Sequence, residues 1–254
     1  MNAADHILHR TRVKICGLTR EQDVDAAVAA GADAVGFVMY RKSPRAVTPQ
    51  RAAELARRLP PFVTPVLLFV NETPAAVLAA CEQVAGAVVQ FHGDETPAQC
   101  LEATAGGKHP FMRVARLDVA ETAAFDLVKF AAEYPQAQAI LLDAHVEGYG
   151  GGGKTFNWSR ITVPSVTAGQ ARTAVALPHL VLSGGLNAAN VADGIVQVRP
   201  RCRTLAVDVS SGVELDGPGN KGLKDPIKIH QFVAAVRAAD RLLAQNQHAF
   251  LSAT

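Results

Sequence analysis

Short apolar runs alternate with amphipathic stretches along most of the chain. Runs such as AVGFVM at 34–39 and VLLFV at 66–70 have no polar face, which is typical of parallel strands covered by helices. The stretches between them repeat apolar residues every three or four positions and therefore predict helices. Three of these helices are predicted to begin with Thr-Pro, at 48–49, 73–74 and 96–97, because threonine caps a helix and proline suits its first position.

This strand-and-helix pattern repeats eight times. The predicted strands are 13–16, 34–39, 66–70, 87–91, 111–115, 139–142, 180–183 and 205–209. Most precede a predicted helix, as strand–helix units require, and the alanine-rich stretch 168–177 is the candidate for the helix after the sixth strand. Eight regular units predict a single-domain (β/α)8 TIM barrel over residues 10–245, with loose terminal tails at 1–9 and 246–254. A doubly wound open sheet is the structural alternative, but it does not need so many regular units.

Composition and charge exclude several classes of function. The chain has 254 residues, 49% of them hydrophobic, and a net charge of +2, which predicts neither a nucleic-acid surface nor a polybasic membrane surface. The sequence lacks a signal-peptide core and any apolar run of membrane-spanning length. The four cysteines, Cys16, Cys81, Cys100 and Cys202, have no CxxC spacing, so neither a disulfide framework nor a zinc site is expected. We expect a soluble cytoplasmic protein that acts on a small molecule.

A glycine-rich loop follows the sixth predicted strand. The strand ends at Asp143, and four consecutive glycines follow at 150–153. Because glycine loses much backbone entropy on ordering, this run predicts a loop whose bare amides, those of Gly152 and Gly153 included, bind an anion. Asp143 alone could be a helix cap or a surface charge. The acid and the loop together favour a phosphate-handling active site.

The same loop also fits the P-loop pattern GxxxxGK[ST], as GYGGGGKT at 148–155. A P-loop follows its strand directly and opens a helix. Here residues 143–147 separate the strand from the pattern, and the sequence after it has no helical period and reaches Pro164. A P-loop nucleotide hydrolase therefore remains only a rival hypothesis.

Two further strand ends carry small residues with free amides or hydroxyls. In a barrel of this type the active site lies at the carboxyl ends of the strands, and phosphate often binds the loops after the seventh and eighth. Gly184 and Gly185 follow the seventh predicted strand, and Ser211 and Gly212 follow the eighth. Each pair alone could be a tight turn, but on adjacent strands they predict a phosphate site near helix N-termini.

Four other side chains at this rim each have two interpretations. Cys16 is either an inert buried residue or an accessible thiolate. His92 is either an acid or ligand, or a hydrogen-bonded structural histidine. Arg45 either faces solvent or binds a carboxylate. Asp208 either orients a ligand hydroxyl or braces its own loop. The residues alone leave these alternatives open.

Several motifs together resemble the phosphoribosylanthranilate isomerase family of tryptophan biosynthesis. They are VKICGLT at 13–19, SPR at 43–45, QFHGDE at 90–95, LLDAHVEGYGGGGKTFNW at 141–158, LSGGLN at 182–187, DVSSGVE at 208–214 and PGNKGLKD at 218–225. They span nearly the whole chain in the order of the family. The chain departs from the family at Gly152, where threonine is usual, and at Asn157, where aspartate is usual.

The resemblance implies an Amadori rearrangement of N-(5-phosphoribosyl)anthranilate to 1-(2-carboxyphenylamino)-1-deoxyribulose 5-phosphate, without metal or cofactor. Asp143 would be the general acid and the Cys16 thiolate the base. Arg45, His92 and Asp208 would bind the anthranilate and the sugar, and the glycine and serine loops the phosphate. Nearby cations such as Lys14 or Arg45 would lower the pKa of the Cys16 thiol.

Other functions remain as alternatives. The related histidine-pathway aminoaldose isomerase carries a carboxylate in place of Cys16, so the cysteine argues against it. A non-catalytic phosphosugar-binding barrel would not need both Cys16 and Asp143. The sequence leaves open whether the protein is a monomer or a homodimer.

Overall fold

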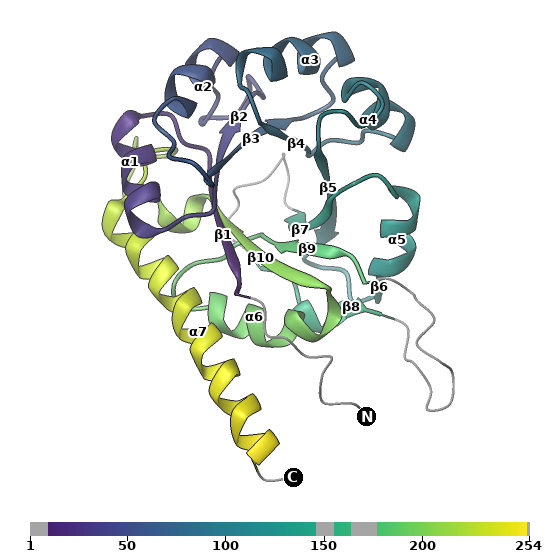
Figure 1. Ribbon diagram of the computed structural model, residues 1–254, viewed down its shortest axis with the longest axis vertical. Helices are drawn as coiled ribbons and strands as arrows, with labels where there is room; N and C mark the ends of the chain where they lie inside the picture. Colours follow the sequence, from purple (N-terminus) through teal and green to yellow (C-terminus); the bar gives the residue numbers. More distant parts are fainter. Residues whose placement is uncertain (1–9, 146–154, 164–176, 253–254) are drawn as a thin grey trace.

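The computed structural model describes residues 10–145, 155–163 and 177–252. Its centre is a closed barrel with the strand order β1-β10-β9-β7-β5-β4-β3-β2 (Figure 1). The barrel strands are β1 (Arg12–Cys16), β2 (Ala34–Val38), β3 (Thr64–Phe69), β4 (Val88–Phe91), β5 (Phe111–Asp118), β7 (Ala139–His145), β9 (His179–Leu182) and β10 (Thr204–Val209). All neighbouring strands pair in parallel, and β1 pairs with β10 to close the ring. The predicted (β/α)8 barrel is therefore confirmed.

Helices surround the barrel. They are α1 (Glu21–Ala30), α2 (Pro49–Ala56), α3 (Pro74–Gln83), α4 (Pro97–Ala103), α5 (Leu127–Glu133), α6 (Val191–Val198) and α7 (Pro226–Ser252), with short 3-10 helices η2 (Trp158–Arg160), η3 (Arg199–Arg201) and η4 (Ser211–Val213). The three predicted Thr-Pro starts are confirmed, because Thr48, Thr73 and Thr96 each accept a hydrogen bond from a backbone amide of their own helix. None of the described helices has the length and hydropathy needed to cross a membrane.

A small outer sheet lies beside the barrel. Strand β6 (Phe125–Asp126) pairs with β8 (Ile161–Thr162), so the segment after β5 is attached to the segment that returns from β7. Arg160 strengthens this attachment, because its guanidinium donates to the carbonyl oxygens of Asp118 at 2.6 Å and Ala123 at 2.7 Å.

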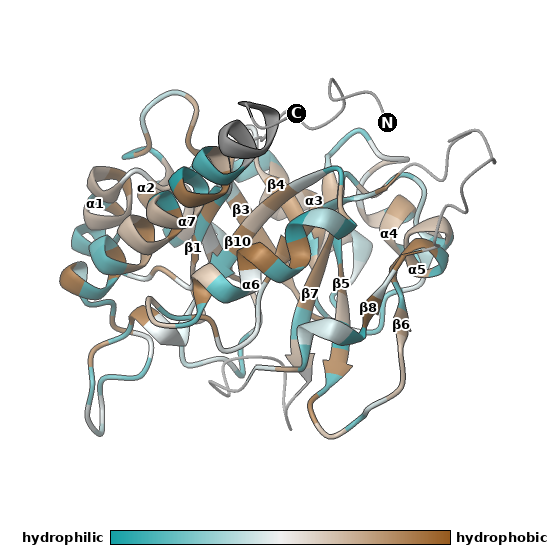
Figure 2. Ribbon diagram, turned by 90° about the horizontal axis from the view of Figure 1, so that it is seen from below, coloured by the Kyte–Doolittle hydropathy of each residue, from teal (hydrophilic) through white to brown (hydrophobic). Residues whose placement is uncertain are grey.

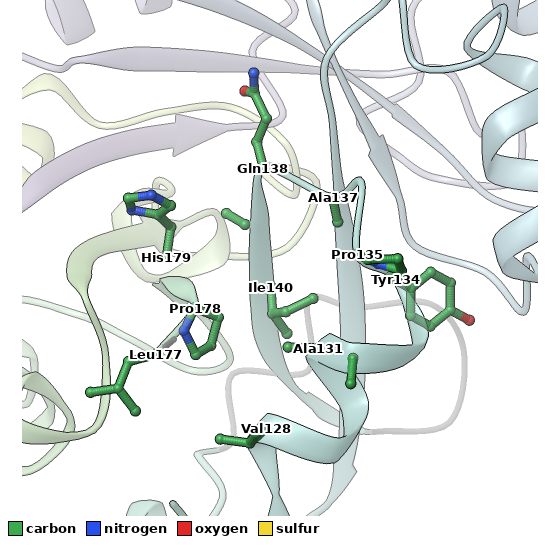
Figure 3. A pocket seen from close by; sticks show the side chains of 12 residues that line it. Val128, Ala131, Tyr134, Pro135, Ala137, Gln138, Ile140, Leu177, Pro178 and His179 are labelled. Atoms are coloured by element: carbon green, nitrogen blue, oxygen red, sulfur yellow. The ribbon is translucent and has the colours of Figure 1, made fainter. Parts of the chain in front are cut away.

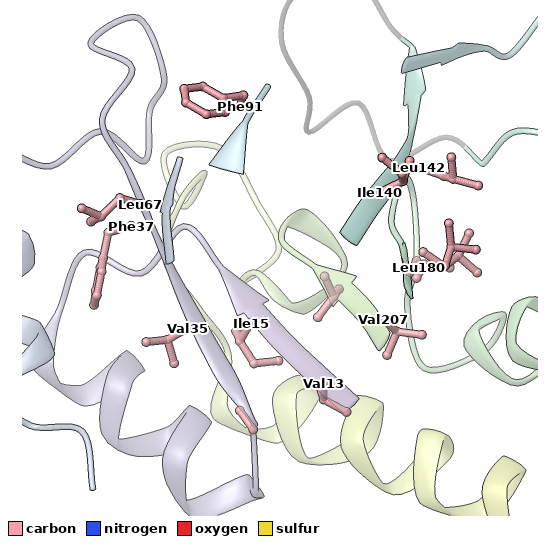
Figure 4. Close-up of a cluster of buried hydrophobic side chains, with 14 of the residues drawn as sticks. Val13, Ile15, Val35, Phe37, Leu67, Phe91, Ile140, Leu142, Leu180 and Val207 are labelled. Atoms are coloured by element: carbon pink, nitrogen blue, oxygen red, sulfur yellow. The ribbon is translucent and has the colours of Figure 1, made fainter. Parts of the chain in front are cut away.

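Side chains along each barrel strand alternate between two layers. One layer, which includes Ile15, Phe37 and Leu142, belongs to the main hydrophobic cluster that also contains the inner faces of the helices (Figure 4). The other layer fills the barrel, where Val114, Leu141 and Val181 form a separate cluster. Figure 2 shows hydrophobic strands beside helices in which hydrophobic and hydrophilic residues alternate, with the arrowheads of β5 and β7 at one end of the barrel.

The same alternation decides where the polar residues at the strand ends point. Leu141 and Val181 are inward residues, and two positions further along their strands lie Asp143 and Ser183. Cys16 likewise belongs to an inner cluster, with Val38, Leu68 and Val70. The side chains that carry candidate chemistry therefore converge inside the carboxyl end of the barrel.

Helix α7 corrects one predicted boundary. The chain does not become a loose tail at residue 246, because α7 continues through Ser252. From Pro226 onward the sequence has neither a glycine nor a second proline to stop the helix, and it is rich in alanine, leucine and glutamine, which favour helix. The predicted N-terminal tail at 1–9 and most of the predicted helix at 168–177 lie outside the described residues.

Candidate active site

Cys16 ends β1 beside a buried ion pair. Only 4% of its surface is exposed. Lys14 points into the barrel from the same strand and donates from Nζ to Oδ1 of Asp208 at 2.8 Å. Ser183 on β9 donates to the other carboxylate oxygen of Asp208 at 3.2 Å. Strands β1, β10 and β9 thus present one connected set of polar groups, with Asp208 bonded to its neighbours rather than to its own loop.

Opposing influences act on the Cys16 thiol. Burial has the largest effect and raises its pKa, the Lys14 ammonium lowers it, and Asp208 raises it. The net result is a pKa above the ordinary value of a thiol. The expectation that nearby cations lower this pKa is therefore wrong in its net direction, because burial outweighs them. For Lys14, burial alone would lower the pKa, but Asp208 and Cys16 raise it, so this side chain is a stable cation.

Arg45 is buried over β1 and does not face solvent. Its Nε donates to Oε1 of Glu214 at 2.6 Å and its Nη2 to Oε2 at 3.0 Å. A Cβ on Gly17, which has φ of +79°, would lie 2.4 Å from Cδ of Arg45, so glycine is required where the two segments meet. The solvent-facing alternative for Arg45 is excluded.

Lys224 joins this ion pair to the loop after β10. Its Nζ donates to Oε1 of Glu214 and to the carbonyl oxygen of Ser210, both at 3.0 Å. Burial would raise the pKa of Glu214, but Arg45 and Lys224 together hold it below its usual value. Arg45, Glu214 and Lys224 therefore form a charged, internally paired network.

Asp143 lies at the inner face of β7, on the other side of the barrel mouth from Cys16 and Arg45. Its Oδ2 is 3.0 Å from Nε2 of His92, and Nδ1 of His92 is 3.2 Å from Nε2 of Gln90. Within the described residues, Oε1 of Gln90 and Nε2 of His92 are buried and form no hydrogen bond, and Nε2 of His92 lies within ion-pair distance of Asp143. His92 is thus braced by Gln90 and also lies against the predicted acid.

The loops after β9 and β10 pack directly on each other and on β7. Gly184 has φ of +82°, and a Cβ there would lie 2.3 Å from the backbone nitrogen of Ala144. A Cβ on Gly212 would lie 1.9 Å from the carbonyl oxygen of Leu186. The structure therefore brings Gly184, Gly185, Ser211 and Gly212 together at one rim. Gly152 and Gly153, also predicted to bind phosphate, lie outside the described residues.

Two cavities lie away from this rim. One of about 450 Å³ is lined by residues of α5 and of the starts of β7 and β9, including Gln138, Ile140 and His179 (Figure 3). The other, of about 690 Å³, is lined by the first residues of several barrel strands, among them Arg12 and Thr204. Both lie toward the amino ends of the strands, so neither belongs to the candidate site.

The sequence did not identify every residue of this site. Glu214 and Lys224 lie on loops and gave no periodic signal, yet they hold Arg45. Ser183 and Gln90 could be found only through strand alternation. Gln90 lies two positions before His92 and shares its inner face, and Ser183 shares the inner face with Asp208 of the neighbouring strand β10.

Comparison with known proteins agrees with this architecture. A model of the N-(5'-phosphoribosyl)anthranilate (PRA) isomerase family matches residues 13–235. The chain belongs to this family. Its activity is accordingly that of an isomerase in tryptophan biosynthesis.

Relatives and solved structures cover almost the whole chain. The N-(5'-phosphoribosyl)anthranilate isomerase of Methylibium petroleiphilum is 57% identical over 238 residues, covering 94% of this chain and 99% of the relative. That of Leptothrix cholodnii is 59% identical over 231 residues, covering 91% and 93%. The Thermotoga maritima enzyme structure is 36% identical with a TM-score of 0.70, over 90% of this chain and 99% of that one.

A fourth similarity concerns a ligand-bound structure. It is a phosphoribosyl anthranilate isomerase in complex with reduced 1-(o-carboxyphenylamino)-1-deoxyribulose 5-phosphate, 33% identical with a TM-score of 0.66, covering 90% of this chain and 99% of that one. Residues 155–163 also argue against the rival P-loop, because within this described segment Thr155 does not open an α-helix and the only helix is the 3-10 helix η2.

Proposed function

We propose that this chain performs the isomerisation with Cys16 as base and Asp143 as acid, on N-(5-phosphoribosyl)anthranilate held between them. The observation that supports this most is the order of the strands. Cys16 ends β1 and Asp143 lies near the end of β7, and the two strands between them, β10 and β9, carry the candidate phosphate loops. A phosphosugar anchored on those loops reaches both side chains.

The first step belongs to Asp143. Its carboxylic acid donates a proton to the ring oxygen of the sugar, the C1–O bond breaks, and the anthranilate nitrogen forms an imine with C1. His92, 3.0 Å from Oδ2 of Asp143, is the candidate proton relay to that carboxyl.

The second step belongs to Cys16. As a thiolate it removes the proton from C2, and the electron pair of that C–H bond moves to form an enolamine, with the imine nitrogen as the electron sink. The enolamine then tautomerises, C1 gains a proton, and the C2 hydroxyl becomes the ketone. The imine serves as the sink, so the step needs neither metal nor cofactor.

The two ends of the substrate bind separately. Gly184, Gly185, Ser211 and Gly212 offer amides and a hydroxyl to the phosphate. The guanidinium of Arg45 has its Nε and Nη2 engaged by Glu214, so Nη1 is the group proposed to meet the anthranilate carboxylate. We assign Gly152 and Gly153 to the same phosphate site.

Loss of the fluorescence of the anthranilate sugar on adding purified protein tests this function. Cys16→Ala and Asp143→Asn should each lower kcat by about 10²–10⁴-fold. Cys81→Ala is the matched control, because Cys81 has the same 4% exposure as Cys16 but lies in α3. Wild-type turnover by Cys16→Ala would require another base, as in the histidine-pathway relative.

The remaining expectations concern the location, the partners and the oligomeric state of the enzyme. We propose a cytoplasmic location and no nucleic-acid or membrane partner. Monomer and homodimer both stay open for this chain, and one similar structure is of monomers generated from the dimeric Thermotoga maritima enzyme. Sedimentation of the purified chain distinguishes the two.

A further inference from the structure

The ion pair between Lys14 and Asp208 is buried at a position where stability alone does not explain it. The Lys14 and Asp208 side chains are 4% and 6% exposed. Desolvating two charges costs several kcal/mol per ion, so a buried pair is weak evidence for stability alone. This pair also lies at the carboxyl end of the barrel, where residues act on ligands, rather than at the end that stabilises the fold.

The backbone places Lys14 against Cys16. Both residues lie on β1, two positions apart, and therefore share its inner face. The register pairs Cys16 with Gly36 of β2. A Cβ on Gly36 would lie 2.7 Å from Sγ of Cys16 and 3.1 Å from Cε of Lys14. The thiol of Cys16 and the aliphatic stem of Lys14 thus lie side by side over Gly36. A hydrogen bond between the two side chains lowers the pKa of the thiol.

We propose that Lys14 is the positioning residue for the base: its ammonium holds the Cys16 thiolate, and Asp208, braced by Ser183, holds the ammonium. This rests on the proposed role of Cys16. It changes the assignment of Asp208 from a ligand for the sugar to a counter-charge that moderates the base.

The proton balance fits this division of roles. When the Cys16 thiolate takes the C2 proton it becomes a neutral thiol, and the ammonium of Lys14 keeps its charge because Asp208 remains beside it. When the thiol loses its proton again, the new anion forms next to the same cation. Lys14 therefore touches neither the substrate nor the transferred proton.

Other charges near Cys16 come from two further segments. Lys224, ahead of α7, also lowers the pKa of the thiol, but it is bonded to Glu214 and Ser210. Arg45 covers Gly17 and is bonded to Glu214. Strand β2 contributes Gly36 and the apolar Val38, and the partly buried Tyr40 just after β2 packs against the same cluster. Lys14 is the one of these cations that is attached to Asp208.

Removing either member of the pair should shift the titration of Cys16, and the two shifts should have opposite signs. Lys14→Met removes the cation and leaves the anion, so the titration of Cys16 should move up by about one to three pH units. Asp208→Asn removes the anion and leaves the cation, so the titration should move down. A merely structural role would not separate the two directions.

Thiolate absorbance in the ultraviolet measures this titration, taken as the difference between each variant and the same variant with Cys16→Ala. Lys129→Met, an exposed lysine on α5, is the control for net charge and should leave the midpoint unchanged. If Lys14→Met does not fold, Asp208→Asn decides alone, and a Cys16 midpoint that stays or rises in it overturns the proposal. If instead Cys16→Ala retains full turnover, the base assignment fails while the titration still reports on the pair.

Discussion

The two sides of the barrel mouth differ in how completely their polar groups are paired. On the β1–β10 side, Lys14 is bonded to Asp208, and Arg45 and Lys224 are both bonded to Glu214. On the β4–β7 side, Asp143 meets only His92 among the described residues, and buried polar atoms of His92 and Gln90 lack hydrogen bonds there.

This difference in pairing determines whether a substitution should mainly change stability or turnover. Charges that satisfy one another hold the first side in place without a ligand. Buried polar atoms without partners carry a cost of about 1–3 kcal/mol each, which a substrate that bonds to them would remove. Loss of Glu214, which pairs two buried cations, should therefore mainly reduce stability, and loss of Asp143 should mainly reduce turnover.

Asp143→Asn should give the largest effect. It keeps the shape but cannot donate a carboxylic proton, so kcat should fall by about 10²–10⁴-fold. Since Asp143 has one polar contact among the described residues, with His92, the free energy of unfolding should change by about 1 kcal/mol or less. Steady-state kinetics and urea unfolding of the same preparation check both statements. A strongly destabilised variant would contradict the comparison.

Glu214→Gln should act in the opposite way. It leaves the buried cations Arg45 and Lys224 without a counter-charge, which should cost about 3–5 kcal/mol of unfolding free energy. Glu54→Gln is the control, because Glu54 forms an exposed pair with Arg51 that is worth about 1 kcal/mol or less.

The Glu214 contribution also has a pH dependence. Its pKa is lowered in the folded state, so its stabilisation is present above the unfolded value of about 4.3 and is lost as the pH falls through the folded value. The difference between wild type and Glu214→Gln should therefore shrink in acid. A constant difference from neutral pH down to acid unfolding would show that the carboxylate is not the cause.

Ser211→Asp should raise KM about tenfold or more, because a carboxylate repels the phosphate and replaces the hydroxyl that is proposed to bind it. Ser211→Ala, which only removes the hydroxyl, should have a smaller effect. A substitution at Gly184 would be a poor test, since any Cβ there meets backbone of Ala144 and would disturb the fold. An unchanged KM in Ser211→Asp would remove this loop from the phosphate site.

The smallest expected effect is the change of the rate with each unit of pH. The pKa of Cys16 is raised, so the thiolate grows about tenfold per pH unit below that value. The rate of the free enzyme should therefore rise throughout pH 7 to about 8.5 without a plateau. A plateau near neutral pH would mean that Lys14 outweighs burial in solution.

The sequence predicted the barrel because its main signals are local. Apolar runs, helical periods and Thr-Pro starts each depend on neighbouring residues, and they placed all eight barrel strands. A local signal is misleading at the start of α1. Thr19 is a residue type that favours a helix cap, yet the cap position is Arg20, which forms no side-chain cap hydrogen bond and bonds to Asp23 through its guanidinium.

The site was predictable only in part. Strand ends identified Cys16, His92, Asp143 and Asp208, because the fold fixes where strand ends meet. Pairing across the ring was not predictable, since it depends on the register between distant strands. Burial also decided the thiol pKa, and no motif in the sequence encodes the depth of a side chain in the finished barrel. The same burial leaves all four cysteines below 9% exposure, so exposure alone does not single out Cys16.

The seam between β1 and β10 has a consequence for when activity first arises. Lys14 and Asp208 are 194 residues apart in the chain, and they meet only when the last barrel strand joins the first. Contacts of such sequence separation form late, because the entropy of closing so long a loop must be overcome first. On a ribosome, a growing chain can build the β2–β5 arc before β10 has been made. The environment of Cys16, the proposed base, would therefore be completed at the same moment as the barrel, and no shorter nascent chain would turn over substrate.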